Sequence, residues 1–366
     1  MIRKDTQRLI LNGKTFGISE MALLSSEWSQ EGQPEWMRSF SSFVMQWYTG
    51  TETLEVTTSG TTGEPKSWRF SREAMRKSAR ITGEFFGFEK GKSVVLCLSC
   101  RYIAGIMMVV RAAEYQMNLI ALPPVLSPLK ALDTAQTADF VAMVPAQVYE
   151  SLQEEETRQK LKTIATLLIG GAPLDEKLEN EIQKIHTNAW CSYGMTETLT
   201  HAGLRKIGDD SPRHVYAPLP GFRFAINTDG CLVIDTPYFP EPVVTRDRGT
   251  LLEGGQFRWT GRADFVINSG GVKIFPDLLE TKLSAFFPLP CFVTSFPDEA
   301  KGEIPVLVVQ SVEKPGEEVL LEWMELLRRH LPAASCPIRI LTVPAFIYTG
   351  SGKIDRNQTL LRFSLR

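Results

Sequence analysis

The sequence has little of what marks several large classes of protein. Its net charge is −2 and its isoelectric point is near 6.2, so no basic excess favours nucleic acid as a partner. The longest apolar runs, such as residues 103–110, fall far short of the roughly 20 residues that span a bilayer. Residues 1–16 hold too short an apolar core for a secretory signal. We therefore expect a cytoplasmic protein without a membrane span.

Cysteine is sparse and scattered, with six residues in the chain. Cys97 and Cys100 form a C-x-x-C, but no second pair and no suitably spaced histidines complete a zinc site. The run VVLCLSC, residues 94–100, is typical of a buried strand. We therefore interpret the cysteines as reduced core thiols, which again favours the cytoplasm. The sequence also lacks repeats and low-complexity tracts.

The most informative segment that is present is TTSGTTGEPK, residues 57–66. Glycine lets backbone N–H groups approach a phosphate without a Cβ in the way, and Ser and Thr hydroxyls add further donors. Lys66 contributes a positive charge. This composition indicates an anion cradle and predicts a nucleotide triphosphate site.

Two other interpretations of this segment are less favoured. A flexible linker needs neither the Glu-Pro-Lys ending nor the amphipathic stretch that follows over residues 71–88. A Walker-type phosphate loop needs its second glycine where Pro65 stands. Proline has no N–H to donate and restricts the residue before it, which argues against the loop of a P-loop kinase or GTPase.

The chain has 366 residues, 43% of them apolar, which is enough for two domains with buried cores. Short apolar runs alternate with helical patterns in the first two thirds of the chain. The runs are almost continuously apolar, which predicts strands buried on both faces of a parallel sheet that helices cover. The expected strands are residues 93–99, 118–124, 139–145 and 164–170, and the expected helices are residues 74–86, 106–116 and 174–186.

After Tyr216 the pattern changes. Residues 222–237 predict a hairpin with Asp229 and Gly230 at its turn, so this part is expected to be antiparallel or barrel-like. Beyond a boundary near residues 261–271, a glycine-interrupted hairpin, two helices and further strands predict an α+β unit of about 100 residues. The expected fold class is α/β, with a large domain over residues 1–263 and a small mobile α+β domain over residues 264–366.

Five segments together resemble the adenylate-forming superfamily of acyl- and aryl-CoA synthetases, adenylation domains and luciferases. They occur in the superfamily's order and approximate spacing over some 300 residues. Within it, the pattern SGG-x-x-I-x-P, the segment LLIGGAPL and the segment YIAGIMMVVRA look most like the o-succinylbenzoate-CoA ligases of menaquinone synthesis. The five segments are TTSGTTGEPK (57–66), YGMTE (193–197), TRD (245–247), GRADFVINSGGVKIFP (261–276) and TGSGKIDR (349–356).

The resemblance implies that ATP first converts a carboxylate to an acyl-adenylate and that the CoA thiol then displaces AMP. Lys353 would bridge the substrate carboxylate and the α-phosphate, where charge builds up. Glu197 would hold Mg²⁺, and Thr196 would donate to the α-phosphate. The phosphate loop would bind through Thr58, Ser59, Gly60, Thr61, Thr62, Gly63 and Lys66.

The remaining nucleotide contacts are also implied by the resemblance. Tyr193 and Gly194, with the backbone of residues Gly170, Gly171 and Ala172, would flank the adenine. Asp247 would accept hydrogen bonds from the ribose hydroxyls, assisted by Arg262.

The small domain is expected to swing between the two half-reactions about a hinge. Asp264 matches the family's hinge position, which absorbs φ/ψ change and carries no chemistry. In the rotated state Ser269, Gly270 and Gly271 would line the pantetheine tunnel, although an ordinary hairpin turn is the alternative. Lys273 either meets the CoA phosphates or is a solvated lysine.

The sequence also departs from the family pattern. Only 56 residues precede the phosphate loop, where typical relatives carry most of a further subdomain, so a homodimer that covers the exposed flank is plausible. The family's T-G-D is T-R-D here, which puts Arg246 beside the ribose site.

In the acid-binding segment, Tyr102 replaces the usual histidine, three residues before Gly105. Arg111, six residues after that glycine, either pairs with a substrate carboxylate or is a helix-face arginine.

We expect an ATP-dependent acid:CoA ligase, most like one for o-succinylbenzoate. An adenylating enzyme for another acid, or one that serves a carrier protein, is the alternative within the enzyme class. A degenerate nucleotide-binding or regulatory protein is the alternative outside it, although the intact Lys66, Glu197, Asp247 and Lys353 argue against such decay.

Overall fold

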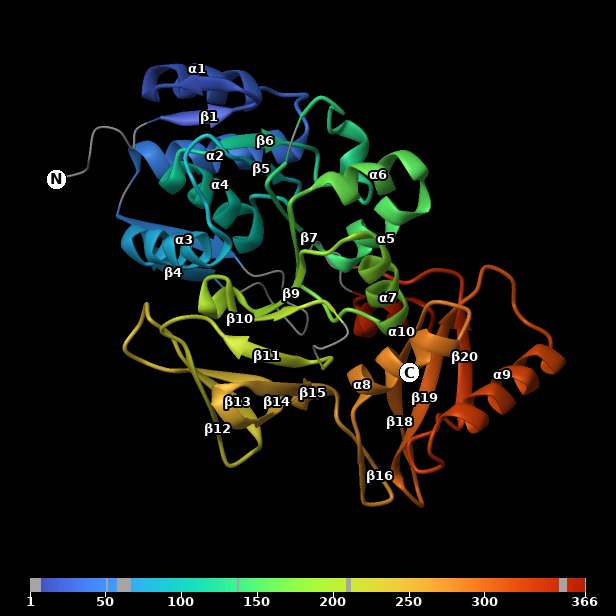
Figure 1. Ribbon diagram of the computed structural model, residues 1–366. Helices are drawn as coiled ribbons and strands as arrows, with labels where there is room; N and C mark the ends of the chain where they lie inside the picture. Colours follow the sequence, from blue (N-terminus) through green and yellow to red (C-terminus); the bar gives the residue numbers. More distant parts are fainter. Residues whose placement is uncertain are drawn as a thin grey trace.

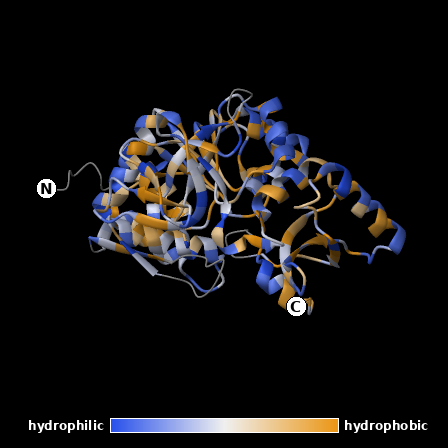
Figure 2. Cartoon of the chain, turned by 90° about the horizontal axis from the view of Figure 1, so that it is seen from below, coloured by the Kyte–Doolittle hydropathy of each residue, from blue (hydrophilic) through white to orange (hydrophobic). Residues whose placement is uncertain are grey.

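The computed structural model describes residues 8–50, 52–57, 67–136, 138–208, 212–348 and 354–365. A large part is built on a 13-stranded sheet, and a smaller carboxyl-terminal part is built on a 5-stranded sheet (Figure 1). Hydrophobic residues concentrate on the strands inside both parts (Figure 2). The expected α/β class, with a large mixed sheet and a smaller α+β part, is confirmed.

The centre of the large sheet is parallel, as the apolar runs predicted. Its strands lie in the order β9-β8-β7-β5-β6, and their apolar side chains are almost all buried. Burial on both faces follows because helices cover the sheet on each side. The strands are β5 (Ser93–Leu96), β6 (Asn118–Ala121), β7 (Phe140–Met143), β8 (Thr166–Ile169) and β9 (Ala189–Gly194).

Helices α4 to α7 connect these strands and α3 precedes β5, with α3 and α4 on one side of the sheet and α5 to α7 on the other (Figure 1). Side chains cap two of them: Ser71 Oγ accepts from the Ala74 N–H at 3.1 Å, and Asp175 Oδ1 accepts from the Leu178 N–H at 2.8 Å. The helices are α3 (Arg72–Phe86), α4 (Ile103–Tyr115), α5 (Pro145–Gln153), α6 (Glu155–Thr163) and α7 (Glu176–Ile185). None of the helices in the described ranges is long and apolar enough to cross a membrane.

The amino-terminal residues cover the β6 edge of the parallel sheet, which the sequence pattern did not predict. Strand β1 pairs in parallel with β6, and β2 pairs with β1. Helix α2 buries Phe40, Phe43 and Trp47 in the main core. The elements are β1 (Leu9–Leu11), β2 (Lys14–Phe16), α1 (Ile18–Trp28) and α2 (Glu35–Thr49).

From β9 onward the same sheet continues with antiparallel strands. The expected hairpin is β12 and β13, and Gly230 at its turn has a φ of 76°, a value that favours glycine. The antiparallel expectation is confirmed as an extension of the large sheet. The strands are β10 (His201–Lys206), β11 (Val215–Pro218), β12 (Arg223–Ile226), β13 (Cys231–Asp235), β14 (Val243–Leu251) and β15 (Phe257–Arg262).

The carboxyl-terminal part has its own sheet and its own buried clusters, which begin at Ile267. Strand β19 pairs antiparallel with β18 and parallel with β20. The elements are β16 (Ile267–Ser269), β17 (Val272–Ile274), α8 (Pro276–Phe286), β18 (Cys291–Asp298), β19 (Gly302–Gln310), α9 (Glu317–His330), β20 (Arg339–Val343) and α10 (Arg356–Arg362).

The six cysteines are free thiols, as expected. Five are buried and Cys291 is half-buried. The C-x-x-C differs in one detail, because strand β5 ends at Leu96 and Cys97 lies just past it. Across the described ranges, no group of three or more His, Cys, Asp or Glu side chains forms a metal-binding cluster.

A buried ion pair joins helix α7 to strand β10. Arg205 donates from Nη1 to Glu179 Oε1 at 2.7 Å and from Nη2 to Glu179 Oε2 at 2.9 Å, and both side chains are buried. This two-bond geometry offsets the cost of taking both charges out of water. The pair therefore fixes α7 against the strand that follows β9.

Replacing Glu179 by Gln should destabilise the fold by about 3 kcal/mol, because Arg205 then stays buried without its countercharge. Urea unfolding measures this effect. Glu176→Gln is the matched control on the same helix, since Glu176 contacts the half-exposed Arg213 at 3.2 Å and its loss should cost less than about 1 kcal/mol. Equal effects of the two substitutions would contradict the structural role of the buried pair.

Candidate functional site

The two glycine-rich loops of the sequence analysis lie outside the described residues. These loops contain Thr58, Ser59, Gly60, Thr61, Thr62, Gly63, Lys66 and Lys353. The structure does describe the backbone that frames them. Strands β3 (Thr53–Thr57) and β4 (Ser67–Ser71) pair antiparallel up to Thr57 and Ser67, on either side of residues 58–66. A bridge between Tyr348 and Ile354 closes the second loop in the same way.

The carboxyl ends of β8 and β9 bring two predicted segments to one edge of the sheet. Residues 170–172 follow β8, and residues 195–197 follow its parallel neighbour β9, which ends at Gly194. A Cβ on Gly170 would overlap Ser192 Oγ, and one on Gly194 would overlap the Thr200 carbonyl. Glycine is therefore needed at position 194, where the contact is with backbone, whereas the Ser192 side chain can rotate away from position 170. Ligands of α/β sheets bind outside such carboxyl ends.

The turn after β9 is fixed by its own hydrogen bonds. Thr198 Oγ1 accepts from the Met195 N–H at 3.0 Å and donates to the Thr200 carbonyl at 2.6 Å. Thr196 and Glu197 are half-buried, and their side chains form no hydrogen bond or ion pair with other described residues, while the Thr196 carbonyl accepts from the Leu199 N–H at 2.9 Å. Their oxygens form a hard donor set of the kind that Mg²⁺ prefers.

Tyr193, Asp247 and Arg262 meet, as the sequence analysis required of a shared site. Tyr193 Oη donates to Asp247 Oδ2 at 2.8 Å, and Arg262 Nη1 lies 3.5 Å from Asp247 Oδ1. Burial, and then the Asp247 carboxylate, raise the pKa of Tyr193 well above its usual value, so its hydroxyl stays a donor.

The Tyr193 ring lies in an aromatic cluster. Its centroid is 5.1 Å from that of Phe257 and 5.8 Å from that of Tyr216. With 8% of the residue exposed, only a small part of it is accessible to a base.

Asp264 lies in a single 3₁₀ turn between the two sheets and is held by two arginines. Its Oδ1 accepts from Arg246 Nη1 and its Oδ2 from Arg262 Nη2, each at 2.7 Å. Burial alone would raise the pKa of Asp264, but these hydrogen bonds lower it below its usual value. The sequence departure at Arg246 thus acts on the expected hinge, a contact that the sequence analysis missed.

A second polar cluster ties the segment after Lys353 to the same turn. Arg356 Nη2 donates to Asp277 Oδ1 at 3.0 Å and to Glu280 Oε2 at 2.8 Å, and its guanidinium lies 4.5 Å from the Phe265 ring centroid. Asp277 Oδ2 accepts from the Arg262 N–H at 3.1 Å. The sequence analysis did not anticipate this cluster.

The segment expected to line the CoA tunnel forms the turn between β16 and β17. Ser269 is buried, and Gly270 and Gly271 have positive φ values of 56° and 83°. The exposed Lys273 lies on β17. The hairpin lies apart from the carboxyl end of β9 (Figure 1), so this orientation does not bring the segment to the nucleotide side.

Two of the expected acid-side residues lie at the start of α4. Tyr102 occupies the N-cap position, and a Cβ on Gly105 would overlap the Ser99 carbonyl, so packing requires that glycine. Arg111, two turns further along α4, is buried and donates from Nη2 to Thr200 Oγ1 at 2.8 Å. It therefore reaches the segment that follows Glu197.

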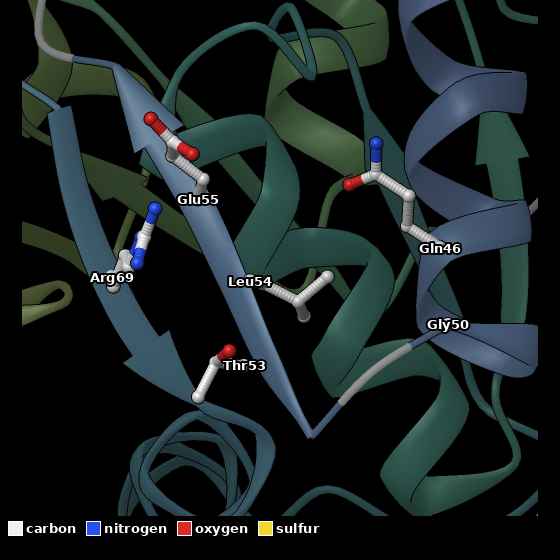
Figure 3. A pocket seen from close by; sticks show the side chains of 6 residues that line it. All are labelled: Gln46, Gly50, Thr53, Leu54, Glu55 and Arg69. Atoms are coloured by element: carbon white, nitrogen blue, oxygen red, sulfur yellow. The ribbon is translucent and has the colours of Figure 1, made fainter.

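A hollow of about 400 Å³ lies beside the β3–β4 ribbon (Figure 3). Leu54 and Gln46 border it from the strand and from helix α2, while Glu55 and Arg69 lie side by side across the two strands. Its lining residues include none of the expected site residues. We therefore do not assign it to the site.

Comparison with known proteins follows this geometry. The AMP-binding enzyme family matches residues 56–236. The 2-succinylbenzoate--CoA ligase of Salmonella typhimurium is 28% identical over 342 residues, which cover 87% of this chain and 70% of that enzyme.

Solved structures agree with this match. An acyl-CoA synthetase (AMP-forming)/AMP-acid ligase II-like protein from Dyadobacter fermentans is 30% identical, with a TM-score of 0.60 over 95% of this chain and 98% of that one. The o-succinylbenzoate CoA synthetase MenE of Bacillus subtilis, solved with its acyl-adenylate intermediate, shares the fold, with a TM-score of 0.69, 21% identity and coverage of 83% of this chain and 68% of that one. The resemblance found in the sequence is confirmed, and the chain belongs to the AMP-binding, adenylate-forming family of enzymes.

Proposed function

We propose that this protein is an ATP-dependent, AMP-forming acid:CoA ligase and that its acid is o-succinylbenzoate. The observation that carries the proposal is the meeting of Tyr193, Asp247 and Arg262 beside the two glycine-bearing strand ends. The ligase names of the relatives support both the reaction and the acid.

The first step has to gather negative charge. A carboxylate is a poor electrophile, so it attacks the α-phosphorus of ATP, the bond to pyrophosphate breaks, and an acyl-adenylate forms. Glu197 would hold Mg²⁺, which would neutralise phosphate charge when bound. Thr196 donates to the α-phosphate, and Lys353 stabilises charge between carboxylate and phosphate. The loop residues Thr58, Ser59, Gly60, Thr61, Thr62, Gly63 and Lys66 hold the other phosphates.

The nucleoside binds at the edge formed by β8, β9 and β14. The ribose hydroxyls donate to Asp247, whose carboxylate is oriented by Tyr193 and Arg262. The adenine lies along the backbone of residues 170–172, with Gly194 and the accessible part of Tyr193 at its other side. Tyr102, Gly105 and Arg111 form the acid side.

The second step uses a different arrangement of two domains, residues 1–263 and 264–366. The small domain turns about Asp264, and residues 269–271 then line the path of the pantetheine chain. The CoA thiolate attacks the acyl carbon, and AMP leaves. A homodimer and a cytoplasmic location remain predictions alongside this mechanism.

Pyrophosphate release with a panel of acids, with and without CoA, tests the proposal. We expect release that depends on o-succinylbenzoate and a thioester product that depends on CoA, with Lys353→Ala as the adenylation-deficient control. Pyrophosphate release with a different acid only would show that this acid, and not o-succinylbenzoate, is the substrate. An acyl-adenylate that CoA does not consume would indicate a carrier protein as the acceptor. ATP binding without pyrophosphate exchange for any acid would overturn the proposal in favour of a regulatory protein.

Tyr193→Phe should raise KM for ATP by about 10-fold, because a hydrogen bond to a charged group contributes about 1.5–3 kcal/mol. Steady-state kinetics with varied ATP measure this change. Tyr216→Phe is the matched control, since it removes a buried hydroxyl from the same aromatic cluster. That hydroxyl contacts Cys191 Sγ at 3.7 Å. The same rise in both variants would mean that cluster packing, and not the orientation of Asp247, sets ATP affinity.

Arg246→Gly removes the exposed ion pair between Arg246 and Asp264, which contributes up to about 1 kcal/mol. The variant should therefore be about 2- to 5-fold faster in the half-reaction that requires the small domain to leave the orientation seen here. Single-turnover rates of adenylation and of thioester formation separate the two steps. About 0.5 M salt should give the wild type the same gain and the variant none.

Arg223→Ala is the control for this change, since Arg223 pairs with Asp235 at 3.4 Å on the large sheet, away from Asp264. An equal change in the rates of both half-reactions would show that Arg246 does not affect domain movement.

A further inference from the structure

Asp277 is a buried carboxylate at the start of helix α8 that joins the two parts of the molecule. Its Oδ2 accepts from the Arg262 N–H at 3.1 Å, at the end of β15 in the large sheet. Its Oδ1 accepts from Arg356 Nη2 at 3.0 Å, at the start of α10 in the carboxyl-terminal part. One side chain therefore connects the last residue of β15 to the segment that follows Lys353.

The contact with Arg262 completes the edge of a strand. The ladder between β11 and β15 pairs Val215 with Arg258, four residues before the end of β15. Further along, the Arg262 N–H donates to the Asp277 carboxylate, which satisfies a backbone donor that needs a partner. Gly261 leaves room for this approach, because a Cβ there would lie 3.3 Å from Asp277 Oδ2. A side chain of the carboxyl-terminal part thus takes the place of a neighbouring strand.

Asp277 does not have the local role that an acidic residue often has in the first turn of a helix. There a carboxylate commonly accepts from the N–H groups of its own helix. Both oxygens of Asp277 are instead bonded to residues outside α8. The start of α8 also contacts the large sheet at a second point, where the Arg248 guanidinium of β14 lies 5.8 Å from the Phe275 ring centroid. Helix capping therefore does not explain this carboxylate.

The neighbouring carboxylate, Glu280, shares Arg356 but stays within the carboxyl-terminal part. Its Oε2 accepts from Arg356 Nη2 at 2.8 Å, and its Oε1 accepts from the Val293 N–H at 2.7 Å. Burial raises the pKa of Glu280 to about 7, although Arg356 lowers it, so Glu280 is only partly ionised at neutral pH. Asp277 therefore supplies the rest of the negative charge that balances Arg356. Of the two carboxylates, Asp277 is the one that also bonds to the large sheet.

The residue that Asp277 holds belongs to the candidate nucleotide site. Arg262 Nη1 lies 3.5 Å from Oδ1 of Asp247, the predicted ribose ligand, and Arg262 Nη2 donates to Asp264 at 2.7 Å. Arg262 precedes the expected hinge at Asp264, and Asp277 follows it. A swing of the small domain about Asp264 moves α8 relative to β15 and breaks the hydrogen bond between Arg262 and Asp277. This bond is thus specific to the orientation seen here.

The orientation seen here fits the first of the two proposed half-reactions, because the hairpin of β16 and β17 lies apart from the carboxyl end of β9 (Figure 1). We infer that Asp277 is a positioning residue for adenylation. Through Arg262 and Arg356 it holds the small domain in the orientation in which the acid reacts with ATP, and it releases Arg262 when the domain turns for thioester formation. The inference rests on the proposed ligase function and adds to it a residue that touches neither substrate.

The two half-reactions of the full-length enzyme test this role separately. Asp277→Asn keeps the size of the side chain, but the amide nitrogen cannot accept a hydrogen bond, so one of the two contacts is lost. We expect the rate of adenylation, measured as acid-dependent pyrophosphate release in a single turnover, to fall about 10-fold. The rate of thioester formation from synthetic acyl-adenylate and CoA should stay within about 2-fold of the wild type.

Glu280→Gln is the matched control, because Glu280 shares Arg356 with Asp277 and bonds to the backbone of β18 instead of the large sheet. It should change the rates of both half-reactions by the same factor. A selective loss of adenylation in Glu280→Gln, or an equal loss of both steps in Asp277→Asn, would show that the cluster supports only the small domain and would overturn the inference. A wild type that releases no pyrophosphate with any acid would overturn the ligase function instead.

Amide hydrogen exchange at Arg262 tests the same bond in the wild type, in case Asp277→Asn does not fold. Mass spectrometry with residue-level fragmentation follows the Arg262 N–H in two complexes, one with ATP and Mg²⁺ and one with CoA and a non-reactive sulfamoyl analogue of the acyl-adenylate. We expect exchange to be at least about 10-fold faster in the second complex, because the donor has lost Asp277 as its partner. Equal protection in both complexes would mean that the bond survives domain movement, which overturns the inference.

Discussion

The position of strand β9 is the constraint on which the rest of the site depends. It pairs in parallel with β8 on one side and antiparallel with β10 on the other, so the direction of the sheet changes at this strand. Its carboxyl end therefore receives the residues after β8, the turn around Glu197 and the first residues of β10 at a single edge. The buried ion pair between Arg205 on β10 and Glu179 on helix α7 holds β10 in place.

The same strand connects the large sheet to the carboxyl-terminal part through a network of polar side chains. Tyr193 holds Asp247, and Arg262 contacts both Asp247 and Asp264. The Arg262 N–H also donates to Asp277, which accepts from Arg356 three residues after Lys353. Asp247, which is the predicted ribose ligand, the expected hinge residue Asp264 and the segment after Lys353 therefore share one polar network. Asp264 and Asp277 each accept hydrogen bonds from two arginines, whereas Asp247 contacts Tyr193 and Arg262.

Sequence patterns predicted the elements whose periodicity is local and long. The helices α3, α4 and α7 and the strands β5 to β8 follow this rule. Strands β1 and β2, of three residues each, escaped prediction because their pairing depends on β6, more than 100 residues away. The site residues were named by motif resemblance, and the structure brings Tyr193, Asp247 and Arg262 together. The contact of Arg246 with Asp264 was not predictable, because it depends on how the first half of β14 meets the turn after β15.

The two buried arginines show why sequence alone does not reveal how a buried charge is compensated. Arg111 and Arg205 both follow apolar residues in a periodic element, and their partners are distant in the chain. Glu179 compensates Arg205 from 26 residues upstream, whereas the described partners of Arg111 are a hydroxyl and a thioether. A fold tolerates the second arrangement only if its other interactions outweigh the desolvation of a cation.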